Sequence, residues 1–400
     1  MPPRFSVLLP TRNRLELLRY AVESVRAQDY PDWELIISDN CSEDDVVGFI
    51  HSLGDNRVVL HRANVPVPVT ENWNNALGHA SGEYVVMLGD DDCLMPGYFR
   101  IVAGLLKERS DPDYVYTDAY LFAYPGVLPD HPNGYLRQGY NTYFHTRRPY
   151  EMGEVERLEI VRKSLGLVPV IHFNMQLSVV SRELIARLSE RGPFFQSRFP
   201  DYYATMVCFI MASRVLIYQQ PLVTIGISPK SYGYFHFNKR QQGGRSFLYG
   251  PESLNDDLGP GHIPGNWEND GWLSAAEAVQ ANYSRELKRA HLRVGFARYR
   301  RLQMLYNLKG YFVDGVVTEG QLRQAWMQFK LWERLAYGLP LGAIVFALAR
   351  LKKTSREQAL RRIRRILGRR NILAEPEWEV SDYANIMDVW RRMPPELADT

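Results

Sequence analysis

Short apolar runs alternate with amphipathic segments along the first 90 residues. The runs at residues 5–9, 33–37, 57–61 and 84–88 predict strands. Apolar positions at helical spacing predict the intervening helices, at residues 15–25, 43–53 and 70–80. Repeated strand–helix–strand units indicate an α/β fold, with a mainly parallel sheet covered by helices on both faces.

Polar residues follow three of these strands: residues 11–14 after the first, Asp39 and Asn40 after the second, and residues 90–92 after the fourth. Open α/β sheets bind ligands at this edge. Three adjacent carboxylates repel one another unless a hard divalent cation neutralises them, and such a cation keeps positions for diphosphate oxygens. We therefore predict a metal-bridged nucleotide. An Asp-rich turn that only ends the strand is the alternative.

The common phosphate-binding loops are absent. No G-x-G-x-x-G follows the first strand, and no G-x-x-x-x-G-K-[ST] occurs in the chain. A cation on residues 90–92, helped by Arg12 or Arg14, would then supply the positive charge that a helix N-terminus supplies in those folds.

Four segments in this order resemble glycosyltransferase family 2, with its Rossmann-like GT-A fold. They are Ser-Val-Leu-Leu-Pro-Thr-Arg-Asn-Arg at 6–14, Glu-Leu-Ile-Ile-Ser-Asp-Asn-Cys-Ser at 34–42, Asn-Trp-Asn at 72–74, and Gly-Glu-Tyr-Val-Val-Met-Leu-Gly-Asp-Asp-Asp at 82–92, followed by Pro96. The resemblance implies an enzyme that transfers a sugar with inversion from a nucleotide diphosphate, with a UDP-sugar favoured. The acceptor would be a glycan or a lipid-linked glycan, as in cell-envelope polysaccharide biosynthesis.

The same resemblance implies the site residues. The nucleotide sugar would be bound by Pro10, Thr11, Arg12, Asn13, Arg14, Asp39, Asn40, Asn72, Asn74 and Asp90. Mn²⁺ or Mg²⁺ would sit on the aspartates, with Asp91 as the direct ligand and Asp92 close by. The chain has Gly89 where the family often has a first aspartate. His236 and His172 are further candidates as base or metal ligand, and for both an ordinary hydrogen-bonded histidine is the simpler interpretation.

Asp201 is the candidate general base, because Pro200-Asp201 matches the second member of the family's Glu-Asp pair. Inversion requires a base across the pocket from the leaving diphosphate. The alternative is structural: Asp201 precedes a predicted helix at 202–213, and aspartate often caps helices. A capping bond would stabilise the ionised carboxylate and lower its pKa.

Two irregular stretches follow the predicted sheet. Residues 120–172 contain many aromatic side chains, which either bind an acceptor sugar or pack a small subdomain: Tyr120, Phe122, Tyr124, Tyr135, Tyr140, Tyr143 and Phe144. Residues 229–273 are predicted to form a lid, with Lys230 and Ser231 closing over the diphosphate. We therefore expect a catalytic domain at 1–228, divided into a nucleotide-sugar half (1–118) and an acceptor half (119–228), followed by the lid and a helical region at 274–400.

The C-terminal region concentrates the positive charge. The chain has a net charge of +3, yet residues 350–370 hold ten Lys or Arg against one Glu, a local charge of +9. The apolar residues 335–351 precede them. This pattern predicts that 335–370 lies in a membrane interface against anionic lipid, or else packs on the catalytic domain. No aromatic residues interleave with the arginines, so we expect no nucleic acid partner.

The remaining features favour a cytoplasmic protein, peripheral on the inner face of the cell membrane if the basic segment docks there. No apolar run reaches about 18 residues, the usual length of a spanning helix, and Met1–Arg4 offers no signal peptide. Three cysteines without metal-ligand spacing argue against a zinc site and a disulfide framework. Two other functions stay open, a nucleotidyltransferase and a non-catalytic nucleotide-sugar-binding assembly protein, as does an oligomer.

Overall fold

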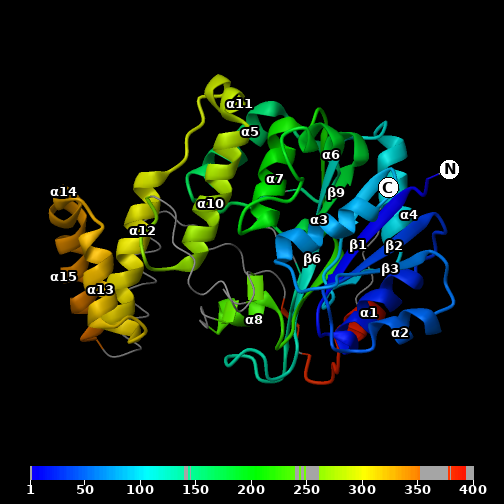
Figure 1. Ribbon diagram of the computed structural model, residues 1–400, viewed down its shortest axis with the longest axis horizontal. Coiled ribbons are helices and arrows are strands. Elements are labelled where there is room, and N and C mark those ends of the chain that lie inside the picture. The colour runs from blue at the N-terminus through cyan, green and yellow to red at the C-terminus, as the bar shows by residue number, and fades with distance from the viewer. Residues whose placement is uncertain are drawn as a thin grey trace.

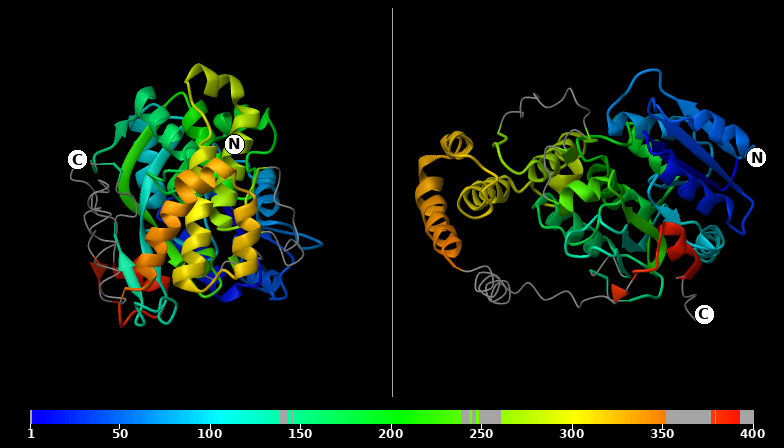
Figure 2. Two further views of the ribbon diagram at one scale, coloured as in Figure 1. Left: turned by 90° about the vertical axis from the view of Figure 1, so that its left-hand side faces the viewer. Right: turned by 90° about the horizontal axis from the view of Figure 1, so that it is seen from below.

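The protein consists of a sheet domain and a helical region, residues 267–349, which extends to one side of the sheet (Figure 1; Figure 2). A computed structural model describes residues 2–138, 143–144, 146–238, 243–244, 247–248, 261–351, 377–378 and 380–392. Most of the buried apolar side chains belong to one cluster, which fills the sheet domain and extends through α10 (Trp267–Asn282) into the helical region.

Four parallel strands form the N-terminal part of the sheet, in the order β4-β1-β2-β3. Their bounds are Phe5–Thr11 for β1, Trp33–Asp39 for β2, Val58–Arg62 for β3 and Tyr84–Met87 for β4. The predicted strands and the α/β fold class are confirmed. β1 continues through Pro10, which lies opposite Ser38 of β2. Proline has no backbone N–H to donate, and this position of the strand does not need one for the pairing.

The three helices between these strands are also those predicted: α1 (Leu15–Arg26), α2 (Val46–Ser52) and α3 (Val69–His79). A fourth helix, α4 (Tyr98–Glu108), follows the turn at Gly97 and was not predicted. The start of α2 differs from the expected residue 43. The Asp45 carboxylate accepts a hydrogen bond from the Gly48 amide and so caps the helix at this point.

The second half of the sheet is mixed, which the sequence did not predict. β9 (Ser178–Ser181) lies antiparallel between β4 and β6 (Tyr114–Ala123), whereas β10 (Val215–Ile227) runs parallel to β6. Shorter antiparallel strands complete it: β5 (Cys93–Leu94), β7 (Tyr135–Arg137), β8 (Tyr150–Glu151) and β11 (Glu377–Trp378).

Helices fill most of the rest of the described chain. Within or beside the sheet domain are α5 (Glu154–Leu165), the 3₁₀ turn η1 (Met175–Leu177), α6 (Arg182–Ser189), α7 (Pro200–Met211) and α8 (Tyr232–Phe237). Beyond α10 follow α11 (Ser284–Arg289), α12 (Phe296–Lys309), the π-turn η3 (Gly310–Asp314), α13 (Glu319–Met327), α14 (Leu331–Glu333), the π-turn η4 (Arg334–Gly338), α15 (Leu339–Ala349) and finally α17 (Ile386–Arg392).

The stretch Leu331–Ala349 is one continuous helical segment of 19 residues with a mean hydropathy of 1.3. By length and composition alone it could cross a membrane, although the sequence predicted no spanning helix. The difference arises at Gly338, Pro340 and Gly342, which look like interruptions in the sequence. Pro340 lies in the first turn of α15, where a missing N–H costs little, so the helix continues through it.

The aromatic stretch and the C-terminus contribute to the core. Tyr120 and Phe122 of β6 are buried, as is Phe144, so for these three side chains the packing alternative holds. Tyr140 lies outside the described residues. Although the helical region stands apart, α17 returns to the sheet domain and packs against α1, β5 and β10 (Figure 2).

Candidate functional site

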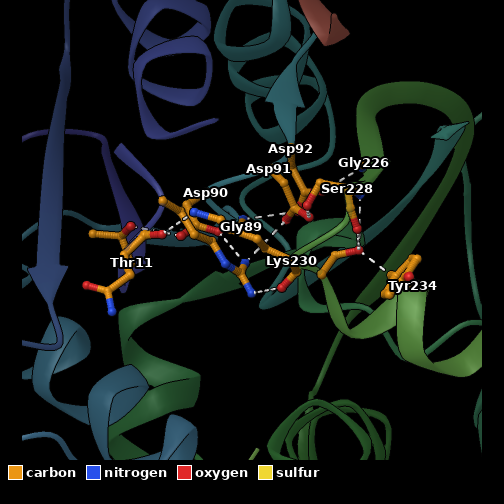
Figure 3. Close-up of polar contacts among 12 residues, drawn as sticks. Thr11, Gly89, Asp90, Asp91, Asp92, Gly226, Ser228, Lys230 and Tyr234 are labelled. Atoms are coloured by element: carbon orange, nitrogen blue, oxygen red, sulfur yellow. Dashed lines mark hydrogen bonds and ion pairs between the residues drawn. The ribbon is translucent and has the colours of Figure 1, made fainter. Parts of the chain in front are cut away.

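Asp90 is anchored by the loop that follows β1. The Thr11 hydroxyl donates to Asp90 Oδ2 at 2.8 Å, and Arg14 Nη1 donates to Asp90 Oδ1 at 2.7 Å (Figure 3). Both carboxylate oxygens therefore have donors, and Asp90 is buried. Thr11 and Asp90 are 79 residues apart in the sequence, and their contact joins the loops after β1 and β4 at the edge where open α/β sheets bind ligands.

Arg14 links this edge to the segment after β10. Its Nη1 lies 4.0 Å from Asp91 Oδ1, and its Nη2 donates to the carbonyl oxygen of Lys230. The Phe247 ring covers the guanidinium at 4.8 Å. Burial alone would lower the pKa of Arg14, but the Asp90 and Asp91 carboxylates outweigh burial and raise it. Arg14 therefore stays charged and is the nearest counter-charge to the aspartates.

Asp92 holds the turn together. Its Oδ1 accepts the Gly226 amide at 2.8 Å, and its Oδ2 accepts the Gln176 side chain at 2.8 Å and the Gly89 amide at 3.1 Å. A Cβ at position 89 would lie 2.5 Å from Asp92 Oδ2, which explains why glycine stands where the family often has aspartate. With three donors on its two oxygens, Asp92 has less capacity left for a cation than Asp91.

Asp91 has the fewest hydrogen-bond donors of the three. Its Oδ2 accepts the Ser228 hydroxyl at 3.0 Å, while Oδ1 faces Arg14 (Figure 3). Burial raises the pKa of Asp91 to about 6, although Arg14 opposes the shift, and burial and the Asp91 charge raise the pKa of Asp92. Burial and mutual repulsion therefore disfavour the ionised forms of these two carboxylates, and a bound cation would offset both effects. An all-oxygen donor set fits a hard divalent cation.

Asp91 would be one of few protein ligands of such a cation. Among the residues that the structure describes, no group of three or more His, Cys, Asp or Glu side chains is arranged to hold a metal ion. His236, the candidate extra ligand, pairs instead through Nδ1 with Glu268 Oε1 at 2.5 Å. Most of the coordination would therefore have to come from diphosphate oxygens and water, as is common for Mg²⁺.

Asp39 offers an unused acceptor at the end of β2. Its Oδ1 accepts the Ser42 amide at 3.0 Å, whereas Oδ2 is buried and has no hydrogen-bond partner, with Arg62 Nη1 3.3 Å away. A buried oxygen without a donor costs free energy. A nucleotide N–H or hydroxyl could donate to this oxygen, which fits the prediction that Asp39 binds the nucleotide sugar.

Three of the four candidate asparagines bond to other parts of the protein. The Asn40 amide exchanges two hydrogen bonds with the Val67 backbone. Asn72 bonds both the hydroxyl and the carbonyl oxygen of Ser38, and the Asn74 side chain bonds the Phe195 backbone in both directions. In the described structure, these amides therefore hold together the segments that surround the predicted binding edge of the sheet.

The loop after β1 contains the other candidates. Pro10 lies within β1, and Arg12 follows it with a partly exposed side chain. Asn13 adopts a positive φ of 53° and uses its side-chain oxygen to accept the Glu43 amide. The Asn13 carbonyl oxygen accepts a hydrogen bond from Lys230 Nζ at 2.8 Å. Lys230, a predicted lid residue, therefore lies at the loop after β1.

Asp201 is the second residue of α7, not its N-cap. Phe199 occupies the cap position without a side-chain bond, and Asp201 Oδ1 accepts the Tyr202 amide at 3.0 Å. The side chain is only partly exposed, and burial raises the pKa of Asp201 to about 7, against the opposing effect of the backbone bonds. A carboxylate with a pKa near the working pH suits a general base.

The segment from Ser228 to Tyr232 reaches from the Asp90–Asp92 turn toward Asp201. Ser231 caps α8, accepting the Tyr234 amide, so its hydroxyl is used inside the segment (Figure 3). Tyr232 donates to Glu268 Oε1 at 3.0 Å. The Tyr232 ring lies 5.9 Å from the ring of Phe199, which precedes α7 and is two residues before Asp201, so this end of the segment packs at the start of α7. Ser228 at the other end contacts Asp91.

Sequence reasoning missed three residues of this arrangement. Ser228, Gln176 and Glu268 contact Asp91, Asp92 and Tyr232, respectively, from distant parts of the chain. No local pattern marks them. His172, the other candidate histidine, accepts the Tyr116 hydroxyl through its backbone carbonyl.

The C-terminal helix α17 packs close to Gly226, the residue of β10 that contacts the aspartate turn (residues 89–92). Gly226 packs so closely on the turn that a Cβ there would lie 1.9 Å from the Asp91 carbonyl oxygen, and the Ile386 side chain lies 3.4 Å from the same position. Ile386 is fully buried in a cluster with Cys93, Met95 and Phe122. α17 therefore limits how far β10 can move away from Asp91.

Replacing Ile386 with alanine should weaken nucleotide-sugar binding as well as stability. Large-to-small core changes cost about 2–5 kcal/mol, and the cavity would lie behind Gly226. Val380→Ala is the control, because Val380 is equally buried in this cluster but lies 3.0 Å from the Cβ position of Gly134 instead. Calorimetry and urea unfolding measure both effects. Equal donor affinity in the two variants would contradict a role for α17 at the site.

Comparison with known proteins identifies the N-terminal part of the chain. The family model for Glycosyl transferase family 2 matches residues 6–155. A GalNAc(5)-diNAcBac-PP-undecaprenol beta-1,3-glucosyltransferase from Campylobacter jejuni is 41% identical over 118 residues, which are 29% of this chain and 37% of that protein. A PGL/p-HBAD biosynthesis glycosyltransferase from Mycobacterium bovis is 30% identical over 124 residues, 30% of this chain and 48% of that protein.

Among solved structures, S. aureus TarS in complex with UDP-GlcNAc aligns with a TM-score of 0.46 at 17% identity, covering 76% of this chain and 91% of that one. The chain spans less than half the length of the two curated relatives above. The matched segment contains the aspartate turn and the loops after β1 and β2. Residues 6–155 therefore match glycosyl transferase family 2, and this part of the chain is similar to curated glycosyltransferases.

Proposed function

We propose that this protein transfers a sugar from a nucleotide diphosphate donor, with a UDP-sugar the first to test, to a lipid-linked or glycan acceptor with inversion. The observation that carries the proposal is the segment from Ser228 to Tyr232, which contacts Asp91 at one end and packs at the other end against Phe199, two residues before Asp201. A donor held at Asp91 and a base at Asp201 would then face the same segment. The Campylobacter jejuni relative is named for an undecaprenol-linked acceptor, which supports the acceptor class.

On the donor side, each residue has a distinct task. Asp39 Oδ2, which has no hydrogen-bond partner, accepts a donor group of the base or ribose, and Arg14 and Lys230 supply positive charge beside the diphosphate. Asp91 would hold Mn²⁺ or Mg²⁺, and such a cation supplies charge compensation for the departing diphosphate. Asp92 keeps the turn in place through the Gly226 amide and the Gln176 side chain.

On the acceptor side, Asp201 accepts the proton of the attacking hydroxyl. The acceptor oxygen forms a bond to the anomeric carbon while the bond from that carbon to the diphosphate oxygen breaks, and the proton passes to the Asp201 carboxylate. Inversion follows because attack and departure occur on opposite faces. The pKa of about 7 makes Asp201 a stronger base than an ordinary carboxylate, and it is still largely ionised at slightly alkaline pH.

A panel of nucleotide sugars tests the donor assignment. UDP-, GDP-, dTDP- and CDP-sugars, each with and without Mn²⁺, should give one base whose thermal stabilisation depends on the metal. A ligand at a hundred times its Kd stabilises by about 2.7 kcal/mol. Stabilisation by none of these sugars would remove the proposal. Equal stabilisation with and without Mn²⁺ would contradict only the role of the metal.

The helical region supports a peripheral location at an anionic membrane. Leu331, Leu335 and Ile344 are more than half exposed along the 19-residue apolar helix. The positive charge of residues 350–370 follows directly, and most of it lies outside the described residues. An apolar helix followed by basic residues is typical of a segment lying in the interface.

Charge reversal should detach the protein from anionic vesicles. Each basic residue near such a surface contributes about 1 kcal/mol, so changing Arg361, Arg362, Arg364 and Arg365 to Glu should abolish sedimentation with phosphatidylglycerol vesicles at low salt. The matched control reverses four exposed charges on and after α11: Arg285, Lys288, Arg289 and Arg293. Equal loss in both variants would indicate only a net-charge effect, and full recovery of the wild type in the supernatant would contradict docking.

A further inference from the structure

An apolar cavity lies inside the helical region, between α12, α13 and α15. Its volume is about 490 Å³, and its lining includes Leu308, Phe312, Leu322, Trp326 and Phe346. These three helices lie side by side in both views of the region (Figure 1; Figure 2). Ligand pockets typically measure about 300–1,000 Å³. The cavity is thus large enough for a ligand and lies in a different part of the chain from the aspartate turn.

Two glycines of the apolar helix shape the cavity. A Cβ at Gly338 would lie 2.4 Å from the Trp326 ring, so this glycine lets the helix approach α13 closely. Gly342, one turn later, also lines the cavity, but the nearest atom to its Cβ position is a Leu308 methyl at 3.8 Å. Gly342 therefore faces open space. The cavity opens to the surface, so its apolar lining meets water when no ligand is bound, and covering that lining with an apolar group is favourable.

Charged groups occur only at one part of the lining, where α13 contributes Glu319 and Arg323. Their ion pair is exposed and 3.3 Å long, and such pairs are weak. Arg323 can therefore contact an anionic head group. Leu339 and Phe346 line the cavity and are also 58% and 42% exposed, so the apolar lining continues onto the surface of the helix.

We propose that this cavity binds one hydrocarbon chain, acyl or polyisoprenyl, of an anionic membrane lipid. The lining matches the chain, and two cations match the negative head group: Arg323 in the lining and Arg350, which lies 4.2 Å from the Phe346 ring. The exposed apolar residues of the same helix would bring the cavity to the bilayer. The inference rests on the membrane docking proposed above and adds a chain-binding site to it.

Photolabelling in vesicles tests the proposal with the full chain. The probe is phosphatidylglycerol carrying a diazirine at the end of one acyl chain, and labelled peptides are identified by mass spectrometry. In the wild type, we expect labels on the cavity residues Leu322, Trp326 and Ala343. Labels confined to Leu331, Leu335 and Ile344 would show that the helix meets lipid without admitting a chain, and would overturn the proposal.

Gly342→Leu fills the cavity and should reduce the cavity labels severalfold. Gly320→Leu is the matched control, because Gly320 is helical, has open space around its Cβ position and is absent from the lining. Equal melting temperatures and equal vesicle sedimentation of the two variants would separate chain binding from folding and from docking. Unchanged labelling in Gly342→Leu would overturn the proposal. A change of oligomeric state in Gly342→Leu with unchanged labels would assign the cavity to a second copy of this chain.

The result is independent of catalysis, because the readout is a labelled peptide and not sugar transfer. If the protein fails to sediment with vesicles, dodecyl phosphate below its micelle concentration replaces them as the probe. Quenching of tryptophan fluorescence on binding that is lost in Gly342→Leu and kept in Gly320→Leu would then support the cavity without the membrane. No binding of dodecyl phosphate would overturn it.

Discussion

Replacing Asp201 with asparagine should lower kcat by a factor of about 10² to 10⁴, the usual contribution of a general base. Asparagine can accept the Tyr202 amide as aspartate does, so the helix start should survive. The donor should bind almost as before, because Asp201 lies on the acceptor side. Steady-state kinetics and donor calorimetry on the same preparation measure both effects. Near-normal turnover would return Asp201 to a structural role.

The pH profile provides a second readout of this residue. Only the ionised carboxylate accepts a proton, so wild-type kcat should rise with pH through about 7, and the rise should disappear in Asp201→Asn. Glu268→Gln is the matched control, since Glu268 is a nearby carboxylate engaged with Tyr232 and His236. If that variant, and not Asp201→Asn, lost the rise, the base would be Glu268.

Stability should change in the opposite direction to activity. The pKa of Asp201 is about 7 in the folded chain, and an unperturbed aspartate has a pKa of about 3.9. Folding therefore favours the protonated form, so the native state loses stability as pH rises from about 4 through about 7, and no penalty exists below that window. Asp201→Asn should consequently melt higher than the wild type at pH 8 and equally at pH 3.5.

Asp91→Asn should remove the metal-dependent part of donor binding, a loss of at least about tenfold, or about 1.4 kcal/mol. The asparagine oxygen can still accept the Ser228 hydroxyl, but the charge that a cation needs is gone. Calorimetry of the best donor with and without Mn²⁺ should give one affinity instead of two. An unchanged response to Mn²⁺ would remove Asp91 as a ligand.

Ser228→Ala separates charge from positioning at the same site. This variant deletes the hydroxyl that holds Asp91 Oδ2 but keeps the carboxylate, so the Mn²⁺ response should persist with a smaller loss of affinity. If Ser228→Ala lost the Mn²⁺ response as completely as Asp91→Asn, the orientation of the carboxylate would matter as much as its charge.

Local patterns determined the N-terminal half of the fold. The apolar runs of β1 to β4 and the helical spacing of α1 to α3 are periodic over five or more residues, so each element could be predicted from its own sequence. The parallel arrangement then followed from the strand–helix–strand order. The polar clusters at residues 11–14 and 90–92 could be assigned to one edge because the carboxyl ends of parallel strands share it.

The antiparallel strands and the C-terminal return could not be predicted in this way. β9 inserts between β4 and β6 from a position more than 90 residues beyond β4, and α17 reaches the core after the whole helical region. Their partners are chosen by side-chain packing between distant segments, which leaves no periodic signal. Ile386 looks like an ordinary apolar residue in the sequence, and only the fold brings it behind Gly226.

The sequence by itself determined the family motifs, the Asp90–Asp92 turn at the sheet edge and the basic C-terminal segment, because each is written in adjacent residues. The tertiary structure decided how the three carboxylates differ. Asp90 is taken by Thr11 and Arg14, Asp92 by three donors, and Asp91 is left with one. These partners come from four separate segments, and burial in the folded chain raises the pKa of Asp91 and of Asp201. Desolvation depends on what surrounds a group in space, which only the folded chain specifies.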